Sequence, residues 1–192
     1  MRIGLVLLFA AALPGSMAAG CAGEGSAEPD ALPVVDRGDQ LGAQAVREVV
    51  AVRTAGAEAG VVSTQIFAVI SAAGQQPPAA GRRTLRRELP PLLAVAAAVW
   101  PRSSETIAGQ APRSEAARLQ RAILLRAVRS EQASLARLRR ELRPAGDPWP
   151  AVLRFGRRSD ELRRRLAGEI DAMMAAIPAN ESEALRRAFA GG

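Results

Sequence analysis

Along most of this chain, apolar residues recur at intervals of three and four, which places them on one face of an α-helix. The clearest such segment spans about residues 113–143, where arginine dominates the other faces. Its apolar stripe consists of Ala117, Leu124, Val128, Leu135, Leu138 and Leu142. β-Branched and aromatic residues are sparse, and no sustained alternation with a period of two favours a strand. The sequence therefore predicts an all-α fold, an antiparallel bundle of about four main helices.

Glycine and proline mark the ends and weak points of two further helices. A first helix is expected over residues 41–73, with a bend or a close helix contact near Gly56 and Gly60, because glycine disfavours a helix interior. A second helix is expected over about residues 91–100, where it is ended by Pro101. This segment is apolar on every side, so it is expected to be the most buried helix of the bundle.

Two more helices are expected in the C-terminal part of the chain. One covers about residues 159–177 and begins at Ser159, a residue type that caps helix N-termini. The last covers about residues 180–190, with Asn180 as its N-cap and Glu183 at the position that completes a capping box. These two helices complete the expected bundle.

The first twenty residues have the order of an export signal, which is a positive charge, an apolar stretch and then small residues. Arg2 supplies the charge, and Ile3–Leu13 is an apolar stretch too short to span a bilayer. Pro14 and Gly15 then break the helix before the small residues. The sequence therefore predicts that residues 1–20 are a signal peptide.

The small residues of this signal lead directly to Cys21, which is the only cysteine of the chain. This arrangement resembles the lipobox of bacterial lipoproteins. Ala19 and Gly20 fit the lipobox pattern, whereas Ala18 stands where leucine is usual. The resemblance implies that Cys21 is diacylated, becomes the mature N-terminus and anchors the protein to a membrane. The protein is then exported and held at the cell membrane or the outer membrane, facing the periplasm or the cell exterior.

Two alternatives account for the same N-terminal residues. Ordinary signal-peptidase cleavage after Ala18 would leave Cys21 as the only thiol of an exported protein. An uncleaved apolar tail on a cytosolic protein would leave the order of charge, apolar stretch and small residues unexplained.

On the lipoprotein interpretation the mature chain has two parts. Residues 21–33 are the lipidated cysteine and a flexible tether, which is acidic, rich in Gly and Pro, and has almost nothing to bury. Residues 34–192 form the helical domain, which the tether holds away from the bilayer.

The residue types that the chain lacks exclude much of enzyme chemistry. His and Tyr are absent and all 26 basic residues are arginine, so no imidazole or lysine amine can act as a base, a nucleophile or a metal ligand. A single cysteine excludes an intrachain disulfide and a thiolate metal centre. No catalytic residue, cofactor or metal is therefore expected. A hydrolase that uses only carboxylates is the alternative, and it requires two acids roughly 5 to 9.5 Å apart in a cleft.

Arginine is concentrated in the middle of the chain, with 20 arginines against 8 acids between residues 82 and 165. The clusters are Arg82, Arg83, Arg86, Arg87, Arg139, Arg140, Arg157, Arg158, Arg163, Arg164 and Arg165. They indicate a surface for an anionic partner, which could be lipid headgroups, a wall polymer or an acidic envelope protein. The alternative is solvated helix faces, since GC-rich codons favour arginine over lysine, although codon usage does not explain the clustering. Nucleic acid is disfavoured, because export separates the protein from it and no aromatic residues are interleaved for base stacking.

Both tryptophans, Trp100 and Trp149, lie beside proline at an expected helix end. They could line a cleft at one end of the bundle, or they could be plugs that close a core with few other aromatics. The sequence as a whole predicts a lipid-anchored envelope protein whose helical domain acts by binding or scaffolding, without catalysis.

Overall fold

The structure is a computed structural model that describes residues 37–142 and 146–190. The helices of this part of the chain are α1 (Arg37–Ala55), α2 (Ala57–Gly74), α3 (Pro78–Gly109), α4 (Glu115–Glu141), α5 (Trp149–Ala176) and α6 (Ala179–Phe189). No strand occurs among the described residues, and the all-α prediction is confirmed. The expected signal peptide, Cys21 and the tether lie outside the described residues.

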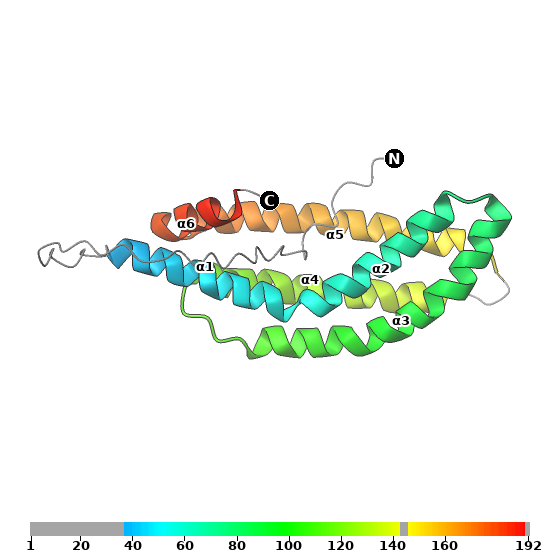
Figure 1. Ribbon diagram of the computed structural model, residues 1–192, viewed down its shortest axis with the longest axis horizontal. Coiled ribbons are helices and arrows are strands. Elements are labelled where there is room, and N and C mark those ends of the chain that lie inside the picture. The colour runs from blue at the N-terminus through cyan, green and yellow to red at the C-terminus, as the bar shows by residue number, and fades with distance from the viewer. Residues whose placement is uncertain (1–36, 143–145, 191–192) are drawn as a thin grey trace, which may run out of the picture.

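The helices run back and forth along the long axis of the molecule (Figure 1). α1 and α2 run in the same direction as one rod, α3 returns, and α4 and α5 follow in alternating directions. α6 turns back and lies along α1, while α4 packs against α1, α3 and α5. Four antiparallel rods therefore form the expected bundle, and α6 is an addition to it.

A single residue, Gly56, separates α1 from α2. Its N–H donates to the carbonyl of Arg53 at 3.0 Å, and its own carbonyl accepts from the N–H of Gly60 at 3.3 Å. Gly56 and Gly60 are both buried, and the rod changes direction between the two helices (Figure 1). The bend expected near these glycines is confirmed.

α3 is much longer than expected, because three prolines lie inside it instead of ending it. It begins at Pro78 and continues past Pro101 to Gly109, and its ribbon curves along the way (Figure 1). Pro90 and Pro91 are exposed, so the backbone carbonyls that lose their helical partners there can face water. The apolar face of the helix meanwhile continues unbroken through the prolines, and its packing outweighs their local penalty.

The expectation that residues 92–99 form the most buried helix is wrong. Leu93, Ala96 and Val99 are buried, but the residues between them face solvent, and Val95 is 48% exposed. α3 packs on α2 and α4 with one face only. The central helix is α4, which has neighbours on three sides.

α5 begins at Trp149, ten residues earlier than expected, so Ser159 is not its N-cap. Ser159 lies buried inside the helix, because the preceding turns bury Ala151, Val152 and Phe155 and extend the apolar face. The N–H of Trp149 instead donates to the carboxylate of Asp147 at 3.2 Å.

The capping expected for the last helix is also wrong. α6 begins after Pro178, and the side-chain amide of Asn180 donates to the carbonyl of Gly38 on α1 at 3.4 Å. Glu183 forms an ion pair with Arg187 at 3.0 Å instead of completing a capping box. Asn180 thus serves a contact with a distant helix, whereas Glu183 pairs within its own helix.

Two clusters of buried apolar residues fill the bundle. The α2–α3 core joins the last turn of α1, through Val52, with α2, α3, much of α4 and the start of α5. Its largest members are Ile66, Leu85, Leu89, Trp100, Ile107, Leu138 and Phe155. The α1–α6 core joins α1, α6, the first half of α4 and the second half of α5. Its members are Ala45, Val49, Ala116, Ala117, Ile123, Ala127, Leu166, Met173, Ile177 and Leu185. The first core is rich in large side chains and the second in small ones.

Candidate functional site: an arginine-rich end of the bundle

The α2–α3 turn and the α4–α5 turn lie at the same end of the bundle, opposite the start of α1 (Figure 1). The side chain of Arg86, near the start of α3, donates to the carbonyl of Gly146 between α4 and α5 at 2.8 Å. This bond joins the two turns. We call residues 75–88, 137–141 and 146–158, which border these two turns, the arginine end.

Three segments that are far apart in the sequence bring arginines to this end. The arginine end contains Arg82, Arg83, Arg86, Arg87, Arg137, Arg139, Arg140, Arg154, Arg157 and Arg158. Its acids are Glu88, Glu141 and Asp147. Four of the expected clusters are therefore gathered in one place, and Arg137 and Arg154, which the sequence did not single out, join them. The formal charge of the arginine end is strongly positive.

Few of these charges are neutralised inside the molecule. Glu141 accepts from Arg154 at 3.0 Å and lies 3.6 Å from Arg158, and Arg87 pairs with Glu88 at 2.6 Å. The arginines that form no ion pair with a described carboxylate are Arg82, Arg83, Arg137, Arg139, Arg140 and Arg157. Most of them are exposed, so their charge is directed to solvent.

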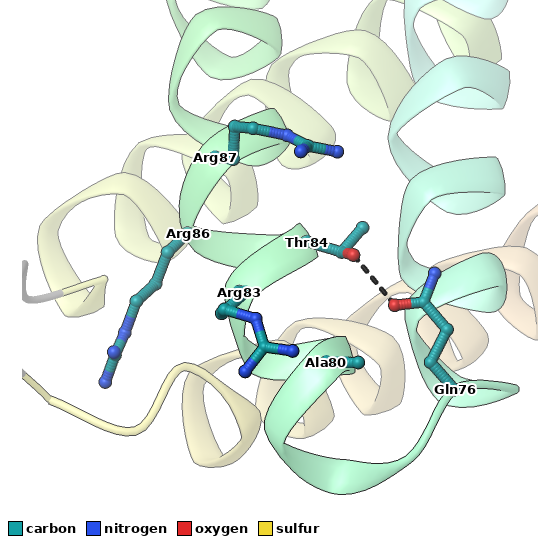
Figure 2. A pocket seen from close by; sticks show the side chains of 6 residues that line it. All are labelled: Gln76, Ala80, Arg83, Thr84, Arg86 and Arg87. Atoms are coloured by element: carbon teal, nitrogen blue, oxygen red, sulfur yellow. Dashed lines mark hydrogen bonds between the residues drawn. The ribbon is translucent and has the colours of Figure 1, made fainter.

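A shallow hollow at the α2–α3 turn presents part of this charge, and Figure 2 shows the side chains that line it. Thr84 donates to the side-chain oxygen of Gln76 at 2.8 Å, which links α3 to α2. The guanidinium groups of Arg83 and Arg87 flank Thr84 on the side that faces α2, while Arg86 points the other way (Figure 2). The hollow is open to solvent and suits a charged group at the surface of a larger partner.

Gly81 allows the close packing that holds this hollow in place. A Cβ at Gly81 would collide with the carbonyl of Ala73 on α2 and would lie 3.3 Å from the ring of Trp149. The same ring lies 3.8 Å from the Cβ position of Gly74. Trp149 thus packs over the α2–α3 turn at the arginine end.

The two tryptophans do not meet. Trp100 lies inside α3, not at a helix end as expected, and its side chain is 1% exposed. Along the helix it is about 28 Å from Gly81, which Trp149 contacts. No cleft therefore lies between the two rings, and each fills a different part of the molecule.

The cluster Arg163–Arg165 lies further along α5 than the arginine end. Arg163 is half-buried, forms an ion pair with Asp160 and places its guanidinium 5.5 Å from the ring centroid of Phe67 on α2. Arg164 donates to the carbonyl of Asp160 at 3.4 Å, and Arg165 is exposed. Arg163 therefore connects α5 to α2, whereas Arg164 and Arg165 are exposed.

A band of polar side chains crosses the bundle beside Arg163, between the two cores. Glu131 on α4 accepts a hydrogen bond from Ser63 on α2, and Arg158 on α5 donates to Ser134 on α4 at 3.3 Å. Burial raises the pKa of Glu131, which the Ser63 bond and the charge of Arg163 only partly oppose. This polar layer holds a single carboxylate, and its bonds fix how α2, α4 and α5 align.

Two glutamates that the sequence analysis did not single out bind the N-terminus of α4. Glu48 on α1 accepts from the N–H of Arg113 at 2.9 Å, and from the N–H and the hydroxyl of Ser114 at 2.8 Å each. Glu181 on α6, 8% exposed, accepts from the N–H of Ala116 at 2.8 Å. The positive end of the helix dipole favours both carboxylates.

The pKa of Glu48 reflects these contacts. Burial would raise it, but the hydrogen bonds from Gln44, Ser114 and Arg113 outweigh burial and lower it to about 2. No local pattern marks Glu48 or Glu181 for this task, because their partner is a backbone far away in the sequence. Both groups hold helices together through these bonds.

No group of three or more His, Cys, Asp or Glu side chains that could hold a metal ion occurs in residues 37–142 and 146–190. Comparison with family models, curated proteins and solved structures gave no match to this chain. The arginine end and the N-terminal sequence are therefore the two features of the chain that bear on its function.

Proposed function

We propose that this protein is an exported, lipid-anchored binding module of the cell envelope that holds phosphate-bearing anions at its arginine end and performs no catalysis. Cys21 is the anchor and residues 22–33 are the tether. The observation that carries the proposal is the convergence of ten arginines and only three acids at one end of the bundle.

Arginine is suited to phosphate because its planar guanidinium can donate two parallel hydrogen bonds to one anionic group. The arginine end offers several such groups on an open surface, with Arg83 and Arg87 on either side of one hollow (Figure 2). An open surface can hold repeated charges, such as those of a polymer or of a lipid headgroup layer. It suits a small molecule less, because small ligands favour enclosed pockets.

The tether is long enough to place the arginine end either far from the anchoring membrane or against it. α1 and α2 together are about 57 Å long, and the arginine end lies at their far end. The chain from Cys21 to Arg37 can span at most about 55 Å. Wall polymers and headgroups of the anchoring membrane are therefore both within reach.

The proposal is tested with two sets of matched variants of the full chain, each carrying Cys21→Ser so that lipidation does not contribute. One set combines Arg83→Gln, Arg139→Gln, Arg140→Gln and Arg157→Gln at the arginine end. The control set combines Arg47→Gln, Arg102→Gln, Arg129→Gln and Arg186→Gln, which are equally exposed and likewise form no ion pair with a described residue. Binding to soluble polyphosphate and to phosphatidylglycerol vesicles is measured at low and high salt.

We expect the first set to weaken binding by about fivefold for each arginine replaced. The control set should change it much less, and added salt should weaken binding of the unsubstituted chain steeply. Equal losses in both sets, or binding that does not respond to salt, would contradict the proposal.

A further inference from the structure

Next to the arginine end, the outward side of the α2–α3 pair carries almost no charge. α2 has one charged residue, Glu58, and α3 has none between Glu88 and Arg102. Among the described helices, α2 alone is long and apolar enough to match a membrane span, yet only 28% of it is buried in the bundle. Apolar surface is therefore left facing solvent on this side.

The most exposed apolar side chains here are Val61, at 58%, and Val95, at 48%. Gly81 of α3 packs against the carbonyl of Ala73 of α2. Because the two helices are antiparallel, a residue a given number of positions before Ala73 lies beside the residue the same number of positions after Gly81. Val61 then lies level with residue 93, within one turn of Val95. The α2–α3 face comprises these two valines with the exposed residues Ala68, Ala72, Pro91 and Ala98, and the exposed Gln65 of α2 is a polar side chain among them.

This face is continuous with the arginines of the hollow. Val95 lies two turns of α3 from Arg87, about 12 Å along the helix axis. Arg87 and Arg83 flank the hollow on the side toward α2 (Figure 2). This apolar strip has one exposed carboxylate, Glu58, beyond Val61 and guanidinium groups at its other end. The apolar side chains and the guanidinium groups match the two layers of an anionic bilayer surface, which are the boundary of the acyl chains and the phosphates.

We infer that the α2–α3 face docks on an anionic lipid bilayer, with Val61 and Val95 at the boundary between headgroups and acyl chains and Arg83 and Arg87 against lipid phosphates. The inference rests on the proposed function and names lipid phosphate as the anion. A second copy of the chain fits this face less well, because it offers the same apolar strip but no concentration of carboxylates to meet the arginines.

Site-specific fluorescence tests this arrangement in the full chain. Cys21→Ser removes the native thiol, and one new thiol is introduced by Val61→Cys, by Val95→Cys or, as a control on the exposed side of α5, by Ala175→Cys. Each thiol carries a dye whose emission shifts to the blue in apolar surroundings. The probes are phosphatidylglycerol vesicles, phosphatidylcholine vesicles and soluble polyphosphate.

We expect a blue shift at positions 61 and 95 with phosphatidylglycerol vesicles only, and none at position 175. Insertion of the N-terminal apolar stretch alone would leave all three dyes in water, so simple tethering is distinguished from docking. In a second measurement, Val61→Ser with Val95→Ser should weaken vesicle binding by about tenfold for each buried valine and leave polyphosphate binding unchanged.

Aqueous emission at positions 61 and 95 on vesicles that do bind the chain would overturn the inference and leave the proposed function standing. A shift that rises with protein concentration in the absence of vesicles would overturn it in favour of a second copy. Loss of both vesicle and polyphosphate binding in the valine variant, with helicity unchanged, would also count against it.

Discussion

At the N-terminal end of α4, carboxylates from α1 and α6 bind backbone N–H groups, whereas around its C-terminal end arginines from three helices face solvent. Glu48 and Glu181 each accept hydrogen bonding from the backbone at the start of α4. Arg83, Arg139 and Arg140 have no carboxylate partner in the described chain. The first end uses its charge to assemble the protein, and the second leaves its charge exposed to solvent.

The two cores differ in the size of the side chains that fill them. The α1–α6 core is built mainly from small side chains, and Gly42 lets α1 approach α6 so closely that a Cβ there would lie 2.9 Å from that of Ala184. The α2–α3 core buries Trp100 and stacks Phe67 on Phe155 with ring centroids 5.5 Å apart. Large side chains thus stiffen the part of the bundle that carries the arginine end.

The largest effect is expected from Trp100→Ala, which removes one of the largest buried side chains of the α2–α3 core. We expect it to lower the free energy of unfolding by about 3–5 kcal/mol. Urea denaturation followed by circular dichroism measures this loss. Leu153→Ala is the control, because Leu153 is 58% exposed and should be close to neutral. A larger loss from Val49→Ala in the α1–α6 core would reverse the comparison of the two cores.

A smaller loss is expected from Gly81→Ala, because the new Cβ would collide with the Ala73 carbonyl and push α2 away from α3. We expect destabilisation of about 1–3 kcal/mol, measured by denaturation. Gly168→Ala is the matched control, since its Cβ would meet nothing within 4 Å. It should stabilise the helix by up to about 1 kcal/mol, the usual gain of alanine over glycine. Stabilisation by both substitutions would show that α2 and α3 pack less closely than the Gly81 contact implies.

The contacts of Glu48 predict a dependence on pH. Its pKa is lowered from 4.5 to about 2 in the folded protein, so its stabilising contribution is complete above about pH 4.5 and disappears as the pH falls toward 2. Glu48→Gln should cost about 1 kcal/mol at neutral pH, as loss of a helix cap does, and should flatten stability against pH in this range. Thermal melts between pH 2 and pH 7 measure both changes. An unchanged acid profile would mean that Glu48 does not hold α4 in this way.

The smallest effect, with the opposite sign, is expected at Glu131 in the polar layer. Burial raises its pKa in the folded state, so the folded protein binds this proton more tightly and loses stability as the pH rises above the ordinary range of a glutamate. Glu131→Gln keeps the shape and removes the charge, so it should leave stability at neutral pH unchanged or slightly higher. The melting temperatures of the unsubstituted protein and of the Glu131→Gln variant should therefore lie closer together at pH 5 than at pH 8. A clear loss at pH 8 would show that the Arg163 charge outweighs burial.

A helix was predictable from the sequence where local residues stabilise it, and it was not where packing on other helices does. α4 was predicted within two residues at each end, because its apolar stripe is long and Ser114 caps it within the local sequence. α3 was not, since its prolines are tolerated only through packing on α2 and α4. The start of α5 was missed because Ser159 resembles a cap, although the turns before it bury Ala151, Val152 and Phe155.

The arginine end was partly predictable. The clusters at Arg82–Arg87 and Arg139–Arg140 lie next to the expected breaks after α2 and after α4. Antiparallel packing places alternate turns at the same end of a bundle, so helix order alone is enough to bring these clusters together. The roles of Glu48 and Glu181 could not be found in this way, because they depend on contacts between residues more than sixty positions apart.

The interruption at Gly56 should allow α1 to open independently of α2. Helix formation propagates from one backbone hydrogen bond to the next, and the ladder is broken where α1 ends and α2 begins. Opening of α1 and α6 therefore need not spread into α2, although the two helices are adjacent in the chain. Amide hydrogen exchange should accordingly show two units that meet at Gly56, with faster exchange in α1 and α6 than in the buried positions of α2 and α3. Thermal fluctuations that start in α1 and α6 should then be confined to that end of the bundle, and the arginine end should keep its shape.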